Sequence, residues 1–197
     1  MPASMRLVLK ILAPYLAVGV FWCGLSNAWL AILAYHAQIL FWRRSDWCGL
    51  ALRTPQRPGT ILVALPCLLT GPLLYWLLPV MTQTDLPTWL HSHHMSRSSL
   101  LVMIPYFGLV HPLLEQVHWR GLRDETAWAH PAFAGYHLLV LSSLLPLPWL
   151  LLCFVVLVAA SVAWQRAAKA TGSLAAPVLS HVLADLGAVL AAWARVQ

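Results

Sequence analysis

Charged residues are scarce in this chain, and their scarcity excludes most soluble folds. Of the 197 residues, 9% are charged and 60% are hydrophobic, whereas about 25% of the residues of an average soluble domain are charged. A soluble domain of this length has too little interior to bury so much apolar surface, but a lipid bilayer removes that requirement. The composition therefore predicts an integral membrane protein whose main partner is the lipid bilayer.

Acidic side chains and paired cysteines are also lacking. Six acidic residues stand against 12 Lys and Arg, which gives a net charge of +6. The basic residues lie between apolar runs and form no single patch, so we interpret them as topology signals and expect no nucleic-acid partner. The four cysteines form no CxxC pair, which argues against a cysteine-based metal or redox motif.

No small-residue cleavage site follows the first apolar run, so we expect no cleavable signal peptide.

Long uncharged apolar runs are what the chain has in abundance. A spanning helix needs about 20 apolar residues. Residues 61–81 and 99–114 are uncharged, and residues 173–194 contain a single acidic residue. Residues 132–164 are too long for one span, and the prolines within residues 146–148 predict a turn that divides them into two spans.

The first 42 residues are harder to divide. One helix over residues 7–42 would be about 54 Å long, which exceeds a bilayer core of about 30 Å. We therefore expect two short spans broken near residues 23–27, with one span and an interfacial helix as the alternative. The chain has no repeat and no linker, so the fold class predicted is all-α: a single membrane domain over residues 1–197, a polytopic transmembrane bundle of about six to seven spans.

Basic residues in the loops between spans predict the orientation of the bundle. Cytoplasmic loops carry an excess of Lys and Arg. Three predicted loops fall on one side of the membrane and carry most of the basic residues: Arg43, Arg44, Arg53, Arg57, Arg120, Arg123, Arg166 and Lys169. We expect that side to face the cytoplasm, in the inner (plasma) membrane of a bacterium.

Three polar segments interrupt the apolar runs. Ionisable groups inside spans are costly, so each is a candidate for function. Glu115 lies near the end of one predicted span, His137 near the start of the next, and His181 near the start of the last. The predicted topology brings these three residues to one leaflet at similar depth. Asp185 follows His181 by four residues and shares its helix face.

These segments resemble the motifs of the CPBP family of intramembrane proteases, which includes CAAX-type prenyl endopeptidases and Abi-like proteins. The family pattern is EExxxR, then FxxxH, then HxxxN or HxxxD. The same order here reads EQVHWR from Glu115 to Arg120, FAGYH from Phe133 to His137, and HVLAD from His181. The resemblance covers residues 99–190, the expected catalytic core. The chain departs from the pattern in one place, because Gln116 stands where the family has a second Glu.

The resemblance implies an intramembrane endopeptidase that hydrolyses a peptide bond of a membrane-associated peptide or protein tail. We expect Glu115 to be the general base that activates a water. His137 would hold the water or donate to the carbonyl oxygen, and His181 with Asp185 would stabilise the oxyanion or position the scissile bond. Supporting roles are expected for four residues near the motifs: Gln116, His118, Arg120 and Phe133.

Other functions stay open at this point. We favour no metal cofactor, but Glu115, His137 and His181 together have the two-histidine, one-carboxylate composition of a catalytic zinc site. Gln116 favours a second alternative, a catalytically degenerate membrane scaffold or immunity protein. A small proton-coupled transporter is a third, although its acid and histidines would be expected to line a path through the midplane.

Two further polar groups are interpreted without a catalytic role. Residues 91–94 read His-Ser-His-His and fall in a predicted loop on the non-cytoplasmic side, where we expect a solvated polar segment. Ser142 and Ser143 are predicted near that same face, away from any His–Asp partner, which argues against a serine protease.

Overall fold

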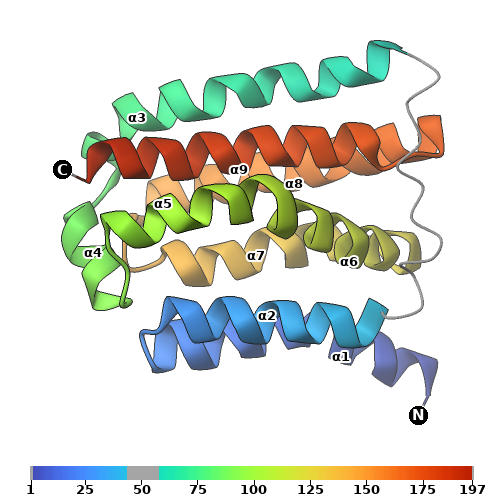
Figure 1. The fold of residues 1–197 in the computed structure, drawn as a ribbon. Helices are drawn as coiled ribbons and strands as arrows, with labels where there is room; N and C mark the ends of the chain where they lie inside the picture. The colour runs from blue at the N-terminus through green and yellow to red at the C-terminus, as the bar shows by residue number, and fades with distance from the viewer. Residues whose placement is uncertain (1, 44–57, 197) are drawn as a thin grey trace.

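The structure is a computed structural model in which residues 2–43 and 58–196 are described. Every regular element in these two ranges is helical (Figure 1), so the predicted all-α class is confirmed. The expected cytoplasmic loop over residues 44–57 lies outside the described residues. The helices run roughly side by side across the molecule, with α4 and the C-terminus at one end and the N-terminus at the other.

The N-terminal segment forms two helices, as predicted. Helix α1 (Ala3–Val18) continues through a π-helical turn, η1 (Gly19–Gly24), and α2 (Ala28–Arg43) follows after a short reversal. The side chain of Asn27 caps α2, because its Oδ1 accepts a hydrogen bond from the Leu30 amide at 3.0 Å. The break predicted near residues 23–27 is therefore confirmed.

The remaining helices follow the predicted runs closely. In chain order they are η3 (Pro58–Leu69), α3 (Thr70–Met81), α4 (Leu86–Ser92), α5 (Arg97–Pro105), η4 (Tyr106–Val110), α6 (His111–Glu125), α7 (Ala129–Leu141), α8 (Leu147–Thr171) and α9 (Ala175–Arg195). The predicted turn at the prolines of residues 146–148 is confirmed, since α7 ends at Leu141 and α8 begins directly after Pro146.

Five of the described helices are long and apolar enough to cross a membrane. They are Ala3–Gly24, Leu62–Met81, Arg97–Glu125, Leu147–Thr171 and Ala175–Arg195. Their outward surfaces carry large exposed apolar side chains such as Val80 and Leu109, which a bilayer would cover. The protein is therefore an integral membrane protein. Helices α2 and α7, with 16 and 13 residues, are shorter than a typical span but lie among the others (Figure 1).

Helix α6 is longer than the sequence suggested, which changes the position of Glu115. We expected Glu115 to lie near the end of the span formed by residues 99–114, but the helix runs on to Glu125. Glu115 therefore lies ten residues, or about 15 Å, before the end of the helix. Arg123, near the end of this helix, is buried inside the bundle.

Helix α9 is held closely against α3, which fixes one wall of the site. A Cβ atom placed on Gly187 would lie 2.6 Å from the backbone nitrogen of Gly71. Only glycine allows the two backbones to approach this closely, as in other tightly packed membrane helices. On its other side α9 packs against α5, η4 and α6, which brings the polar residues of α9 next to Glu115.

Candidate functional site

Glu115 is the centre of the polar cluster, and its two oxygens have different surroundings. The side chain is fully buried on α6. Its Oε1 accepts hydrogen bonds from the hydroxyl groups of Tyr35 on α2 and Tyr136 on α7. Its Oε2 has no hydrogen-bond partner among the described residues. One oxygen is therefore anchored by two donors, while the other is available to a ligand or a water.

His181 faces the free oxygen of Glu115 from the neighbouring helix. Its Nε2 lies 3.5 Å from Glu115 Oε2 and 3.4 Å from Oδ1 of Asp185. Asp185 is one turn further along α9, which is why the two side chains share a face. The indole of Trp164 stacks on the His181 ring, with centroids 4.6 Å apart, and this packing holds the ring in place.

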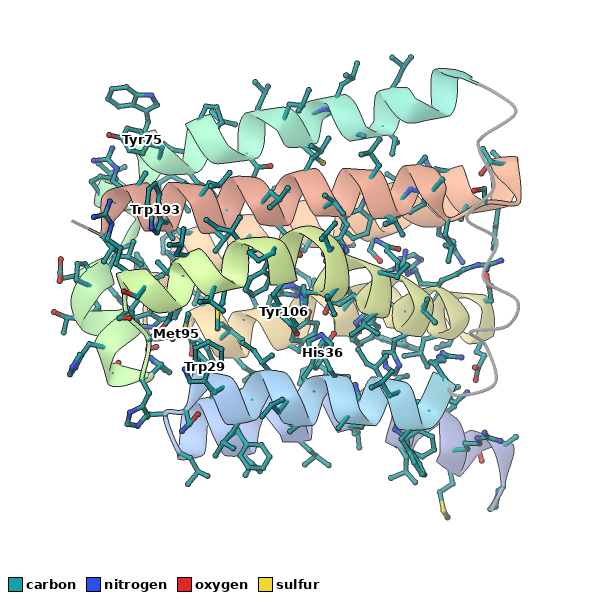
Figure 2. The ribbon with its side chains drawn as sticks, viewed as in Figure 1. Trp29, His36, Tyr75, Met95, Tyr106 and Trp193 are labelled. Carbon is teal, nitrogen blue, oxygen red and sulfur yellow. The ribbon has the colours of Figure 1, made fainter. Side chains whose placement is uncertain are left out.

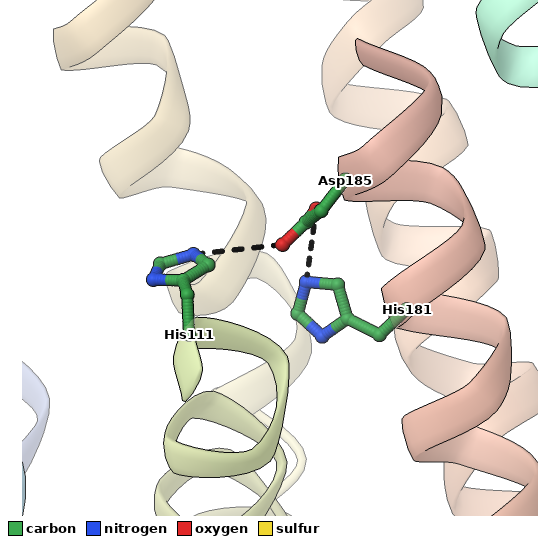
Figure 3. Close-up of side chains that lie close together, drawn as sticks. All are labelled: His111, His181 and Asp185. Carbon is green, nitrogen blue, oxygen red and sulfur yellow. Dashed lines mark ion pairs between the residues drawn. The ribbon is translucent and has the colours of Figure 1, made fainter. Parts of the chain in front are cut away.

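A further histidine, His111, belongs to the cluster, although it was not predicted from the sequence. Its Nε2 lies 3.6 Å from Glu115 Oε2 and 3.9 Å from Asp185 Oδ2. Figure 3 shows His111 on α6 and His181 on α9 converging on the Asp185 carboxylate from two sides. The signal was present in the sequence, because a histidine four residues before Glu115 must share its helix face.

His137 joins the cluster through a tyrosine. Its Nδ1 lies 2.8 Å from the carbonyl oxygen of Phe133, one turn earlier in α7. Its Nε2 lies 3.1 Å from the hydroxyl of Tyr136, which in turn donates to Glu115. The structure thus connects His137 to Glu115, but through Tyr136. Neither Tyr35 nor Tyr136 was expected at the site.

Phe133 supports the site by packing. The side chain is 1% exposed, and its ring meets those of Trp119, His137 and Trp164 edge-on, with centroids 4.9 to 5.8 Å apart. These contacts fix the start of α7 against α6 and α8. Phe133 therefore sets the direction in which His137 and Tyr136 point.

Gln116 is held between an arginine and a histidine. Its amide group lies 3.3 Å from His181 Nδ1, and its Oε1 accepts a hydrogen bond from Arg123 Nη2 at 3.3 Å. Arg123 is buried and also donates to the carbonyl oxygens of Trp119 and Ser161. Gln116 therefore acts here as a hydrogen-bonding neighbour of His181.

Two residues expected to support the site lie elsewhere. The Arg120 side chain is 41% exposed and faces Asp124, with Nε and Oδ2 3.9 Å apart. Five residues turn a helix by about 140°, so Arg120 cannot share the Glu115 face, whereas Gln116 and Arg123, seven residues apart, do share one. His118 is fully buried, but its ring packs against Trp119 and its carbonyl oxygen accepts from Arg43 at 2.8 Å.

The histidines of residues 91–94 are only partly solvated, contrary to the prediction. His93 is 6% exposed. Its ring stacks on Trp22 with centroids 4.3 Å apart, and its Nδ1 lies 2.8 Å from the carbonyl oxygen of Trp89. His91 and His94 are exposed, as expected. Trp22 and His93 also line a cavity of about 340 Å³ at this end of the bundle, and Glu115 is not part of its lining.

Two serines that line this cavity have hydrogen-bond partners, and Ser142 Oγ donates to the carbonyl oxygen of Leu139 at 3.0 Å. Ser143 Oγ accepts a hydrogen bond from the Trp89 indole at 2.8 Å.

Comparison with protein-family models, with curated proteins and with solved structures found no match.

Proposed function

We propose that this protein is an intramembrane endopeptidase that hydrolyses a peptide bond of a membrane-associated peptide or protein tail. The observation that carries the proposal is the asymmetry of Glu115. Its Oε1 is held by two tyrosine hydroxyls, and its Oε2 lies unpartnered beside two histidines. A buried carboxylate fixed by one oxygen is well placed to take a proton with the other.

In the proposed reaction, a water bound next to Glu115 Oε2 attacks the carbonyl carbon of the scissile bond. Glu115 takes one proton from the water as the new C–O bond forms. The tetrahedral intermediate then collapses, the C–N bond breaks, and Glu115 gives the proton to the leaving amine nitrogen. General-base catalysis of this kind supplies about 10²- to 10⁴-fold of the rate.

The other residues of the site have roles that fit this reaction. His181 and Asp185 form the polar pair next to the reacting position, where stabilisation of the developing oxyanion has the largest effect in a site that excludes water. The contacts from Glu115 to Tyr136 and from Tyr136 to His137 keep the base oriented. These roles agree with those implied by the resemblance to the CPBP family.

The membrane setting supports a membrane-associated substrate. Glu115, His111 and His181 lie within two of the five helices that are long and apolar enough to span a bilayer. A soluble peptide would have to leave water to reach them, whereas a lipid-associated tail is already in the bilayer. We propose that the site opens toward the cytoplasmic side, where the predicted basic loops lie.

A comparison of two carboxylate-to-amide variants on the same helix tests the proposal. Glu115→Gln removes the base, while Asp124→Asn changes an exposed carboxylate that faces Arg120. Membranes from cells with the native chain and with each variant would be compared for cleaved membrane peptides by mass spectrometry. We expect cleavage products with the native chain and Asp124→Asn and none with Glu115→Gln. Identical peptide profiles for all three proteins would favour a non-catalytic scaffold.

A further inference from the structure

Three side chains outside the glutamate–tyrosine contacts converge like ligands of a metal ion. One donor atom from each of His111, His181 and Asp185 lies within 4.8 Å of the others (Figure 3). Two nitrogens and one carboxylate oxygen form a known composition for a catalytic zinc site. This set differs from the one the sequence suggested, since His111 and Asp185 belong to it and His137, whose Nε2 faces Tyr136, does not.

The spacing of the donor atoms suits a small cation. Zinc binds nitrogen and oxygen ligands at about 2.0 to 2.2 Å, so ligands at tetrahedral angles are about 3.4 Å apart. His181 Nε2 lies 3.4 Å from Asp185 Oδ1, and His111 Nε2 lies 3.9 Å from Asp185 Oδ2. These separations exceed those of direct hydrogen bonds, which are about 2.7 to 3.2 Å. The contacts are thus ion-pair contacts to the two oxygens of Asp185, and one donor atom from each of the three side chains lies within 4.8 Å of the others.

Unpartnered oxygens at the same place call for a positively charged ligand. Glu115 Oε2 and Asp185 Oδ2 are both buried and have no hydrogen-bond partner among the described residues. A buried polar atom without a partner costs about 1 to 3 kcal/mol, and more when it is charged. A divalent cation bound by Asp185 would remove that cost at its carboxylate, and a water on the cation could donate to Glu115 Oε2.

The hydrogen bonds behind His111 leave its Nε2 lone pair facing the Asp185 carboxylate. His36 Nδ1 lies 2.7 Å from the carbonyl oxygen of Ile32, so it must carry the proton of the ring and donate. His36 Nε2 is then an acceptor for His111 Nδ1 at 3.1 Å. The second proton position of His111 is therefore filled, which is the arrangement found behind metal-binding histidines. Tyr106 also contacts His36, and Figure 2 shows the two residues facing one another between α2 and the middle of the α5–α6 helix.

From these observations we propose that His111, His181 and Asp185 bind a divalent transition-metal ion, zinc by the chemistry of its ligands. Glu115 Oε2, 3.6 and 3.5 Å from the two histidines, lies beside the fourth position, which is left for a water. Metal binding stands on the geometry alone, whereas its part in peptide hydrolysis rests on the proposed function. There the ion would lower the pKa of the water that Glu115 deprotonates.

Gln116 sets the strength of this site. A guanidinium only donates, so Arg123 holds the Gln116 oxygen and the amide NH₂ faces His181 Nδ1. A metal on Nε2 requires the ring proton on Nδ1, and a carboxylate at position 116 could accept that proton's hydrogen bond, whereas the amide NH₂ cannot. We therefore expect Gln116→Glu to bind zinc about tenfold more tightly than the native chain, in line with other neighbours of metal-binding histidines.

The test measures metal binding without any peptidase assay. The full-length protein, purified in detergent and stripped with a chelator, would be titrated with Zn²⁺ by calorimetry and with Co²⁺ while its visible spectrum is recorded. We expect about one ion per chain and the strong absorption of four-coordinate cobalt. His111→Gln and Asp185→Asn should each lose most of this binding. His91→Gln, which changes an exposed histidine on α4 at one end of the bundle, should leave binding unchanged.

Glu115→Gln separates this proposal from the proposed function. It should keep the metal and lose peptide cleavage, because Glu115 is the base beside the ion and not one of its three ligands. Failure of the native chain to bind Zn²⁺ or Co²⁺, or equal binding by native and Asp185→Asn protein, would overturn the metal site and leave the glutamate mechanism standing. Tighter binding by Gln116→Glu would support it even if a ligand variant fails to fold.

Discussion

His181 Nε2 lies 3.5 Å from Glu115 Oε2, although the two residues come from different helices, α9 and α6. The contact places an imidazole next to the one oxygen of Glu115 that the tyrosines leave free. The proposed chemistry depends on this pairing and on the side chains that fix it.

Removing either tyrosine should weaken the proposed base to a different extent. Tyr35→Phe removes one donor to Glu115 Oε1, whereas Tyr136→Phe removes the other and also the link to His137. Hydrogen bonds to charged groups contribute about 1.5 to 3 kcal/mol, so we expect each variant to lose at least about tenfold in kcat, with the larger loss for Tyr136→Phe. The measurement is the rate at which each variant cleaves a substrate peptide identified by the mass-spectrometric comparison of membranes. Equal losses would show that the contact with His137 has no part in the reaction.

Substitutions of Arg120 and Arg123, both on α6, should differ in their effect on stability. Arg123 is buried and donates to Gln116, Trp119 and Ser161, so Arg123→Gln should lower the free energy of unfolding by at least about 2 kcal/mol. Arg120 is half-exposed, and Arg120→Gln should change the free energy of unfolding by less than about 0.5 kcal/mol. Thermal unfolding in detergent would compare them. A larger effect of Arg120→Gln would contradict the assignment of Arg123 as the buried residue.

The close approach of α3 and α9 predicts strong sensitivity at one glycine. A Cβ on Gly187 would overlap the backbone of Gly71, whereas a Cβ on Gly19 would meet no atom within 4 Å. We expect Gly187→Ala to destabilise the protein by about 1 to 3 kcal/mol, as overpacking does, and Gly19→Ala to have little effect. The melting temperatures of both variants in detergent provide the measurement. A stable Gly187→Ala protein would mean that α3 can move away from α9.

His93 should stabilise the end of the bundle opposite the α6 C-terminus. Its ring stacks on Trp22, and its Nδ1 is within hydrogen-bond distance of the Trp89 carbonyl oxygen. We expect His93→Ala to lower the melting temperature. His91→Ala changes an exposed histidine on the same helix turn and should leave the melting temperature unchanged. Both should leave peptide cleavage intact, since neither residue lies near Glu115. Loss of cleavage in a folded His93→Ala protein would point to a second functional region.

The sequence by itself determined the membrane character and most of the helices. Apolar runs of spanning length can only satisfy their backbone in a bilayer by forming helices, so the spans ending near Met81 and Arg195 and the turn before Leu147 followed from local composition. The i, i+4 relationship likewise fixed His181 and Asp185 on one face. Glu115, His137 and His181 were singled out because polar groups inside apolar runs are rare and costly.

Only the tertiary structure decided which side chains meet. Tyr35, Tyr136 and His36 reach the site from other helices, and no local pattern says which face of α2 or α7 turns toward α6. Only the tertiary structure shows which of Arg120 and Arg123 is buried. Both are basic residues near one helix end, but Arg123 packs against α8, whereas Arg120 stays half-exposed. Chain composition sets which segments enter the membrane, whereas the contacts between helices, which are long-range in sequence, set the direction in which each polar group points.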